Sequence, residues 1–286
     1  MTRPVAPKAI EVSFICACRA ELTALKPGNV HIHSPGHGMD VATFERAADA
    51  AAPFIADPEL SVGKRILRAT EASVAATGVN ANLGIVLLCV PLAKAAQEAV
   101  ANLGLRRKLA DLLARLDEDD ADDAFHAIRL ANPAGLGKVE EGDVSTSNPR
   151  MTLIEAMHLA AQRDRIANAY VTAYSDVFDV ALPALEEAQK AGEQEHLAIT
   201  TLHMTLLAAF PDSHIVRKWG PVAAASVQER ARDLSPLWNP ITTPKSFNAL
   251  LEFDRQLKEA GYNPGTTADF VVTTKFAQSL IKQKQP

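Results

Sequence analysis

The chain has 286 residues and a formal net charge of −5, and its residues are 48% hydrophobic, 22% charged and 5% aromatic. This composition is ordinary for a globular protein and excludes a mainly disordered chain. Without a basic excess there is no general attraction to polyanions, so we expect no nucleic-acid partner.

Three cysteines, Cys16, Cys18 and Cys89, have no zinc-site spacing and form no Cys-x-x-Cys pair. They are typical of reduced thiols in a reducing compartment. The strongest apolar run, 83–93, is shorter than the roughly 18 residues that a membrane helix needs. No signal-peptide pattern is visible. We therefore expect a soluble, cytoplasmic protein without a membrane partner.

Apolar residues recur at helical spacing between Pro and Gly breakers, and the low aromatic content favours helices over sheets. Ser61, Thr152 and Thr243 stand at N-cap positions, and Thr266 with Asp269 resembles a capping box. The sequence predicts one all-α domain over 1–286 of roughly ten helices, with long polar loops at the active site. The expected helices cover 9–25, 41–56, 61–77, 80–102, 105–116, 120–131, 152–178, 181–191, 194–209, 213–233, 244–260 and 267–282.

The first polar loop, 26–40, carries chemistry-bearing side chains directly after a helix. Lys26 can pair with a phosphate and Asn29 can donate a hydrogen bond to one. Glu21 and Asp40 offer oxygen ligands to a hard cation. Histidines 31, 33 and 37 lack the i, i+4 helical pair of many catalytic zinc sites, so zinc is a weaker interpretation. A solvated surface loop is the alternative.

Two further segments offer donors to an anion. Asn80 and Asn82 precede the apolar helix, where backbone N–H groups attract phosphate. Gly135 and Gly137, in the second polar loop, 132–150, allow a ligand to approach the backbone closely. No strand precedes them, which excludes both the dinucleotide-binding fingerprint and the Walker loop. A simple Asn cap and a flexible connector are the alternatives.

The fourth segment places Asp164 between two arginines on the expected helix 152–178. Adjacent residues point in different directions on a helix, so these three cannot form one salt-bridge stripe. An inward Asp164 can bind Mg²⁺ or stabilise a cation, and Asp176 follows it. Arg217 and Lys218 can meet phosphates from one helical turn. A solvated helix face is the alternative.

Taken together, these segments resemble the triphosphoribosyl-dephospho-CoA synthase family, in order and over nearly the whole chain. Any one motif is weak, and the ordered set is specific. The motifs that carry the resemblance are KPGNVH at 26–31, GHGMD at 36–40, GVNANLGIVLLCVPLA at 78–93, AIRLANPAGLG at 127–137, LIEAMHLAAQRDRIANAY at 153–170, SDVF at 175–178, DSHIVRKWG at 212–220 and NPGTTADF at 263–270.

The resemblance implies an all-helical enzyme that uses ATP as a ribosyl donor. The ribosyl group of ATP would be transferred through its anomeric carbon to a ribose hydroxyl of dephospho-CoA, adenine would leave, and the triphosphate would stay on the transferred sugar. The KPGNV form at 26–30 is closer to members from methanogens and methylotrophs. A precursor of a tetrahydromethanopterin-type cofactor is therefore an alternative acceptor, by analogy only.

Two other interpretations remain open: an Mg²⁺-dependent nucleotide hydrolase with water as the acceptor, and a non-catalytic nucleotide-binding protein. The abundance of apolar helices makes a homodimer plausible, but no residue pattern identifies an interface.

Transfer from a ribose–base bond passes through an oxocarbenium-like state, which needs a carboxylate near the sugar, a base for the hydroxyl and help for the leaving group. The triphosphate needs Mg²⁺ and basic groups. We expect three roles. The catalytic groups are Asp164, Asp176 and Asp40. The metal ligands are Glu21, Asp40 and Asp164. The substrate-binding residues are Lys26, Asn29, Asn80, Asn82, Gly135, Gly137, Arg217 and Lys218.

Overall fold

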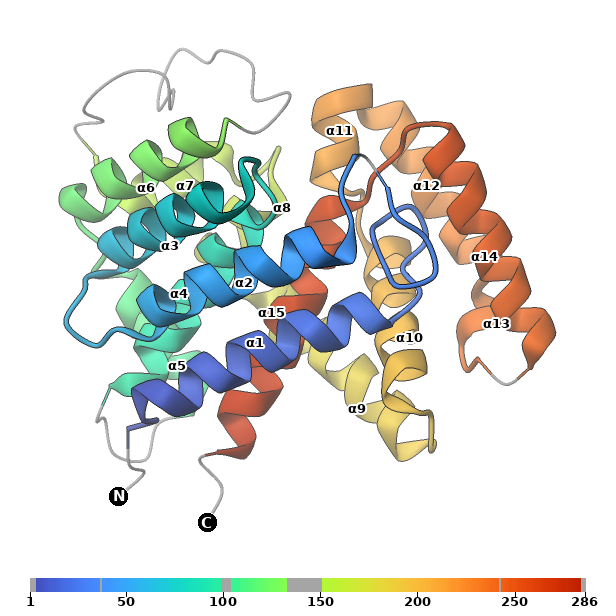
Figure 1. Ribbon diagram of the computed structural model, residues 1–286, viewed down its shortest axis with the longest axis horizontal. Coiled ribbons are helices and arrows are strands. Elements are labelled where there is room, and N and C mark those ends of the chain that lie inside the picture. Colours follow the sequence, from blue (N-terminus) through green and yellow to red (C-terminus); the bar gives the residue numbers. More distant parts are fainter. Residues whose placement is uncertain (1–3, 37, 99–103, 133–150, 242, 284–286) are drawn as a thin grey trace.

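The computed structural model describes residues 4–36, 38–98, 104–132, 151–241 and 243–283 (Figure 1). These residues contain fifteen α-helices, one π-helical turn and no sheet. The prediction of an all-α fold is confirmed, and the expected number of helices was too small. Gly135 and Gly137 lie outside the described residues, so their predicted role stays a prediction.

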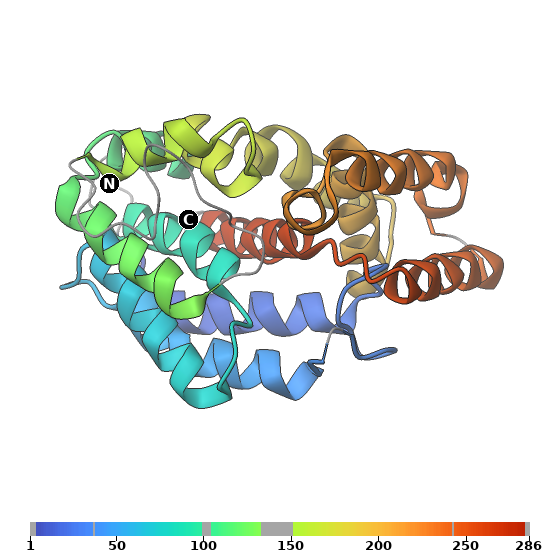
Figure 2. The ribbon, with the colours of Figure 1, turned by 90° about the horizontal axis from the view of Figure 1, so that it is seen from above.

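The C-terminal helix α15 (Gly265–Lys282) runs through the middle of the molecule (Figures 1 and 2). It packs against α1 (Pro7–Thr23) and α4 (Leu83–Gln97). Nearly every residue of α4 is buried, as its almost continuous apolar sequence requires. The helices α2 (Val41–Ala56) and α3 (Val62–Thr77) cover this centre on one side.

The first hydrophobic core is completed by shorter elements from the middle of the chain. Those elements are α5 (Leu105–Leu113), α6 (Glu118–Ala131), α7 (Leu153–Ala160), α8 (Arg165–Val171), the π-helical turn η1 (Asp176–Ala181) and α9 (Leu182–Lys190). In the part of the chain that the structure describes, no helix is both long and apolar enough to cross a membrane.

A second hydrophobic core lies among the later helices, on the right in Figure 1. One face of α10 belongs to the first core and another face to the second, so α10 joins the two. The helices of this part are α10 (Glu195–Ala209), α11 (Ser213–Trp219), α12 (Pro221–Asp233), α13 (Ser235–Trp238) and α14 (Pro244–Glu259).

Two expected helices are broken, one of them a second time between Val171 and Asp176, and the breaks near Asp164 and Gly220 have local causes. The expected helix 152–178 ends at Ala160 and restarts at Arg165, because the Asp164 side chain accepts hydrogen bonds from the backbone N–H groups of Ile166 and Ala167. Asp164 is therefore an N-cap and not a mid-helix residue. The expected helix 213–233 breaks at Gly220, whose φ of 86° lies outside the helical region.

The predicted caps were mostly right. Ser61 and Thr243 cap α3 and α14, and Thr152 forms a full capping box with Glu155. The expected capping box at Thr266 was wrong, because α15 begins at Gly265 without a side-chain cap at its own N-cap position.

Pro91 lies inside α4 and has no N–H to donate to the carbonyl of Leu87, four residues earlier. The Tyr170 hydroxyl donates to this carbonyl oxygen at 2.6 Å. Tyr174 donates to the next carbonyl, that of Leu88, at 3.0 Å. Tyrosines from the segment that follows Asp164 thus replace the hydrogen bond that Pro91 cannot make. These contacts fix α8 against α4.

We expect Tyr170→Phe to lower the free energy of unfolding by about 1–3 kcal/mol, because it leaves the buried Leu87 carbonyl without a donor. Adding Pro91→Ala to this variant supplies the missing N–H, so the double variant should recover part of the loss. Urea unfolding of the two single variants and the double variant gives the coupling energy. Strictly additive losses would contradict this account of Pro91.

Candidate active site

The beginnings of four helices meet around one group of charged side chains. The backbone N–H of Arg165, at the start of α8, donates to Ser213 at the start of α11 at 2.8 Å. Asp212, just before α11, accepts from Thr267 in the first turn of α15. A Cβ added at Gly84, in the first turn of α4, would overlap the Asp269 carboxylate. Helix N-termini attract anions, so this meeting point is the candidate site.

Asp212 is buried and its carboxylate caps two helices at once. One oxygen accepts from the backbone N–H groups of His214 and Ile215 at 2.9 and 3.1 Å. The other accepts from the backbone N–H and the hydroxyl of Thr267 at 2.7 and 2.8 Å. Because all four donors come from the protein, Asp212 fixes the position of α11 relative to α15.

Two arginines at the site are each held by a carboxylate. Arg217 of α11 pairs with Asp164, and Arg165 of α8 pairs with Asp176. The Arg165 guanidinium also lies over the Phe210 ring, 4.0 Å from its centroid. The Nε atoms of both arginines are buried and have no hydrogen-bond partner among the described residues. Each guanidinium thus keeps donor capacity that a planar oxyanion could use.

A small pocket opens beside these pairs. Its lining includes Arg165, Asp176, Phe210, Asp212 and Thr266. Cationic, anionic and apolar groups therefore share one hollow at the start of α15.

Asp269 lies half-buried on α15, in the second turn. Burial raises its pKa well above the ordinary value of 3.8, and the nearby carboxylates of Asp212 and Glu21 raise the pKa further. The structure shows no hydrogen bond or ion pair to its carboxyl group from any described residue. Asp269 therefore differs from Asp164, Asp176 and Asp212, whose carboxylates are all engaged.

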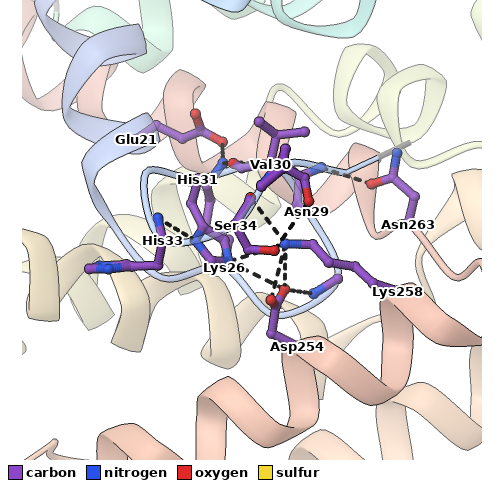
Figure 3. Close-up of polar contacts among 12 residues, drawn as sticks. Glu21, Lys26, Asn29, Val30, His31, His33, Ser34, Asp254, Lys258 and Asn263 are labelled. Atoms are coloured by element: carbon purple, nitrogen blue, oxygen red, sulfur yellow. Dashed lines mark hydrogen bonds and ion pairs between the residues drawn. The ribbon is translucent and has the colours of Figure 1, made fainter. Parts of the chain in front are cut away.

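The first polar loop is anchored by a buried ion pair at the end of α1 (Figure 3). The Lys26 ammonium contacts Glu21, the Asn29 side-chain oxygen at 3.0 Å and the Val30 carbonyl at 2.6 Å. Burial lowers the pKa of Lys26, and the Glu21 charge opposes this shift. An ammonium has three donors, so in this conformation Lys26 has none left for a phosphate.

Asp254 of α14 fixes the same loop from the opposite side (Figure 3). Its carboxylate accepts from the backbone N–H of Gly28 at 2.8 Å and from Lys258 at 3.0 Å. His31 Nε2 lies 3.3 Å from it. Burial lowers the pKa of His31, although Asp254 opposes the shift. The motif at 26–31 thus joins α1 to α14 through buried polar contacts.

The other predicted site residues are more scattered. Asn29 donates to Asn263 at 2.8 Å, directly before α15. Asn80 accepts from the backbone N–H of Leu83, and Asn82 accepts from Ser73. Both asparagines therefore stand at the start of α4, as predicted.

Two predicted site residues lie on the surface. Asp40 is exposed and caps α2 through Thr43. Lys218 is exposed, with its ammonium 5.8 Å from the centroid of the Trp219 ring. Among the described residues, no group of three His, Cys, Asp or Glu side chains is placed to hold a metal ion. Glu21, Asp40 and Asp164 therefore do not form a ligand set in this structure.

The sequence analysis missed the roles of Asp212, Asp254 and Asp269. Asp212 and Asp269 were visible only as parts of the motifs at 212–220 and 263–270, where an acidic residue near a helix start has an ordinary capping explanation. Asp254 had no signal at all, because it lies within a regular amphipathic helix.

Comparison with known proteins gives one family over almost the whole length. Residues 7–286 match the CitG family, ATP:dephospho-CoA triphosphoribosyl transferase. A Pectobacterium atrosepticum protein named 2-(5''-triphosphoribosyl)-3'-dephosphocoenzyme-A synthase is 31% identical over 101 residues, which are 35% of this chain and 32% of that protein. The aligned region thus spans about a third of this curated relative.

Two further relatives align over most of their length. A Salmonella gallinarum protein, which carries the same name with the qualifier "probable", is 24% identical over 272 residues, 88% of this chain and 83% of that protein. A solved Archaeoglobus fulgidus structure, whose description as a triphosphoribosyl-dephospho-CoA synthase is likewise qualified, has a TM-score of 0.59 at 22% identity, and the match covers 82% of this chain and 96% of that one. This structural similarity supports the fold.

We expect Asp212→Asn to lower the free energy of unfolding by about 2–4 kcal/mol, because an amide nitrogen cannot accept from Thr267 and one of the two caps is lost. Asp40→Asn is the matched control, since an exposed Asn caps about as well as Asp. Thermal unfolding measures both. Equal, small losses would contradict the double-cap assignment.

We expect Lys26→Met to cost about 3–5 kcal/mol of stability, because it leaves the Glu21 carboxylate buried and unpaired. The double variant Lys26→Met/Glu21→Gln removes that uncompensated charge and should recover part of the loss. Urea unfolding decides between this structural role and a phosphate-binding role, for which Lys26→Met would fold with normal stability.

Proposed function

Because this chain belongs to the ATP:dephospho-CoA triphosphoribosyl transferase family, we propose that it transfers the triphosphoribosyl group of ATP to a hydroxyl of dephospho-CoA and releases adenine. Within the chain itself, the proposal is supported by the pair of arginines at the meeting point of α8, α11 and α15. Their guanidinium groups and the helix N-termini provide a positive environment for a polyanion.

Arg217 and Arg165 are the residues that we propose for the triphosphate. Each is held by a single carboxylate, Asp164 or Asp176, and each has a buried Nε without a partner in the described structure. A triphosphate carries several negative charges and fits the planar guanidinium fork. It can therefore replace the carboxylates as the partner of both arginines. Lys218, exposed on the same helix as Arg217, adds positive charge at the rim.

The exchange of partners would free the Asp176 carboxylate and the Asp164 oxygen that does not cap α8, beside the bound nucleotide. We propose that these two carboxylates then stabilise the positive charge that develops on the ribose as the bond to the base lengthens. Asp40, which is exposed at the start of α2, is a weaker candidate for this role. Asn80 and Asn82 remain candidates for binding the sugar through their amides.

Mg²⁺ does not fit a protein-built site in the described residues, since Glu21, Asp40 and Asp164 are engaged separately by Lys26, Thr43 and Arg217. Mg²⁺ bound with a nucleotide commonly keeps several waters and takes its other ligands from the phosphates. We therefore propose that Mg²⁺ enters as a complex with ATP.

A cytoplasmic location is part of the same proposal. Cys16, Cys18 and Cys89 are free thiols in this structure. Free thiols are typical of proteins in reducing compartments, where ATP and coenzyme A precursors are also present.

The test is adenine release. Purified protein is incubated with ATP and Mg²⁺, with and without dephospho-CoA, and adenine, ADP and AMP are separated by chromatography. We expect adenine only when dephospho-CoA is present. Adenine without an acceptor would indicate a hydrolase. Adenine that appears only with an aryl-ribitol pterin precursor would keep the transfer and overturn the acceptor.

Within this assay we expect Arg217→Gln to raise the KM for ATP about 10- to 100-fold, the effect of losing charge-assisted hydrogen bonds to the triphosphate. Lys218→Gln, on the exposed side of the same helix, should change this KM much less. An unchanged KM in Arg217→Gln would contradict the assignment of Arg217 to the triphosphate.

A further inference from the structure

The carboxyl group of Asp269 on α15 lies against Gly84 in the first turn of α4, beside Ile166 of α8. Only a glycine fits at position 84, because a Cβ there would overlap the Asp269 carboxylate and lie 3.0 Å from Ile166 Cδ1. The three helices thus leave space for this one side chain. Asp269 is in the second turn of α15, so it is not needed as a cap for that helix.

The charged groups around Asp269 disfavour a negative charge on its own carboxyl group. Asp212 faces it from the start of α11, Glu21 from the end of α1 and Asp164 from the start of α8. The cations nearby are Arg217 and Lys26, and these already pair with Asp164 and Glu21.

No described residue donates a hydrogen bond to Asp269 to compensate its charge. Burial and the three carboxylates raise the pKa of Asp269 well above 3.8. Folding therefore shifts the equilibrium of this group towards the neutral carboxylic acid.

A second observation at the start of α4 also indicates a ligand here. Asn82 is 5% exposed, and its side-chain nitrogen is buried with no hydrogen-bond partner in the described part of the chain. Leaving a buried amide donor without an acceptor is energetically unfavourable. Asn82 is two residues before Gly84, so an unused donor and an unused acid lie at the same helix N-terminus.

We propose that Asp269 is the general acid that protonates the departing purine, an inference that rests on the proposed transfer from ATP. In this step the C1′–N9 bond of ATP breaks and its electron pair goes to the purine. Asp269 gives its proton to the purine at N7, so that neutral adenine leaves. The acceptor hydroxyl forms the new C1′–O bond and loses its proton to water, and a proton from water restores the acid.

This role explains why Asp269 has no cationic partner among the residues that the structure describes. A carboxylate held by an arginine is ionised at neutral pH and cannot donate a proton. A carboxyl group kept neutral by burial and by like charges can, as in other enzymes that use a protonated acid at neutral pH. Asp164 and Asp176, each paired with an arginine, are suited to the opposite task of stabilising positive charge.

The first experiment measures the protonation state without any substrate. The variant is Asp269→Asn, and Asp233→Asn, at an exposed carboxylate of α12, is the matched control. Above pH 4 the unfolded wild-type chain ionises Asp269, whereas under the proposal the folded chain keeps it neutral. This difference destabilises the wild-type fold progressively as pH rises.

We therefore expect the melting temperature of Asp269→Asn to rise relative to that of wild type between pH 4 and pH 8. The difference in melting temperature between Asp233→Asn and wild type should stay constant over this range. If the difference for Asp269→Asn also stayed constant, Asp269 would be an ordinary ionised carboxylate and the proposal would fail. This result does not depend on whether the protein uses ATP.

The second experiment compares ATP with 7-methyl-ATP, whose purine is already cationic and leaves without a proton. Asp269→Asn should lower kcat/KM with ATP by about 10²- to 10⁴-fold, the usual contribution of a general acid. It should lower kcat/KM with 7-methyl-ATP by less than about tenfold and remove the alkaline decline of kcat with ATP. Equal losses with both donors would give Asp269 a structural role and overturn the proposal.

The two experiments separate the possible failures. The melting curves could show that Asp269 is protonated while the wild type releases no adenine under any condition. This result would overturn the proposed function, and with it the catalytic role of Asp269. Normal turnover of ATP by Asp269→Asn would overturn the acid alone.

Discussion

The carboxylate of Asp212 joins the beginnings of α11 and α15, and the geometry of the candidate site depends on this junction. The helix α15 belongs to the first hydrophobic core, whereas α11 packs in the second. Asp212 accepts two hydrogen bonds from each helix. It thereby sets the position of Arg217 on one helix relative to Asp269 on the other, although their segments are far apart in the sequence.

Other buried charged side chains near the site are also held by several polar partners. The Lys26 ammonium has three partners and the Asp254 carboxylate contacts the loop, Lys258 and His31 (Figure 3). Such pairs add little net stability over apolar packing, but removing one partner is costly. They therefore fix one arrangement of the loop against α14. In the proposed function, phosphate binding therefore falls to the arginines of α8 and α11.

The central helix α4 shows how a local defect is used to connect elements. Pro91 leaves a carbonyl without its helical donor, and Tyr170 supplies one from α8. The start of α8, with Asp164 and Arg165, is thereby held near the start of α4, where Gly84 and Asn82 lie. Two ion pairs and one uncompensated acid result at the same place. This contrast between engaged and unengaged carboxylates is what suggests different chemical roles for similar residues.

The sequence by itself determined the all-α fold and most helix boundaries, and it indicated several segments of the candidate site. It could do so because apolar periodicity, caps and Pro or Gly breakers act over a few residues, and the ordered motifs indicated the family. The sequence did not show which charged side chains are engaged by other residues and which are not. Lys26 and Asp164 looked free in the sequence and are engaged, whereas Asp269 looked like a capping residue and is unengaged.

Only the tertiary structure decided these roles, because burial and ion pairing depend on contacts between distant segments. Residues 21, 84, 212 and 269 meet through the packing of four helices, and no local pattern encodes their mutual distances. The protonation state of a carboxyl group follows from the charges and the burial around it, which exist only after the chain has folded.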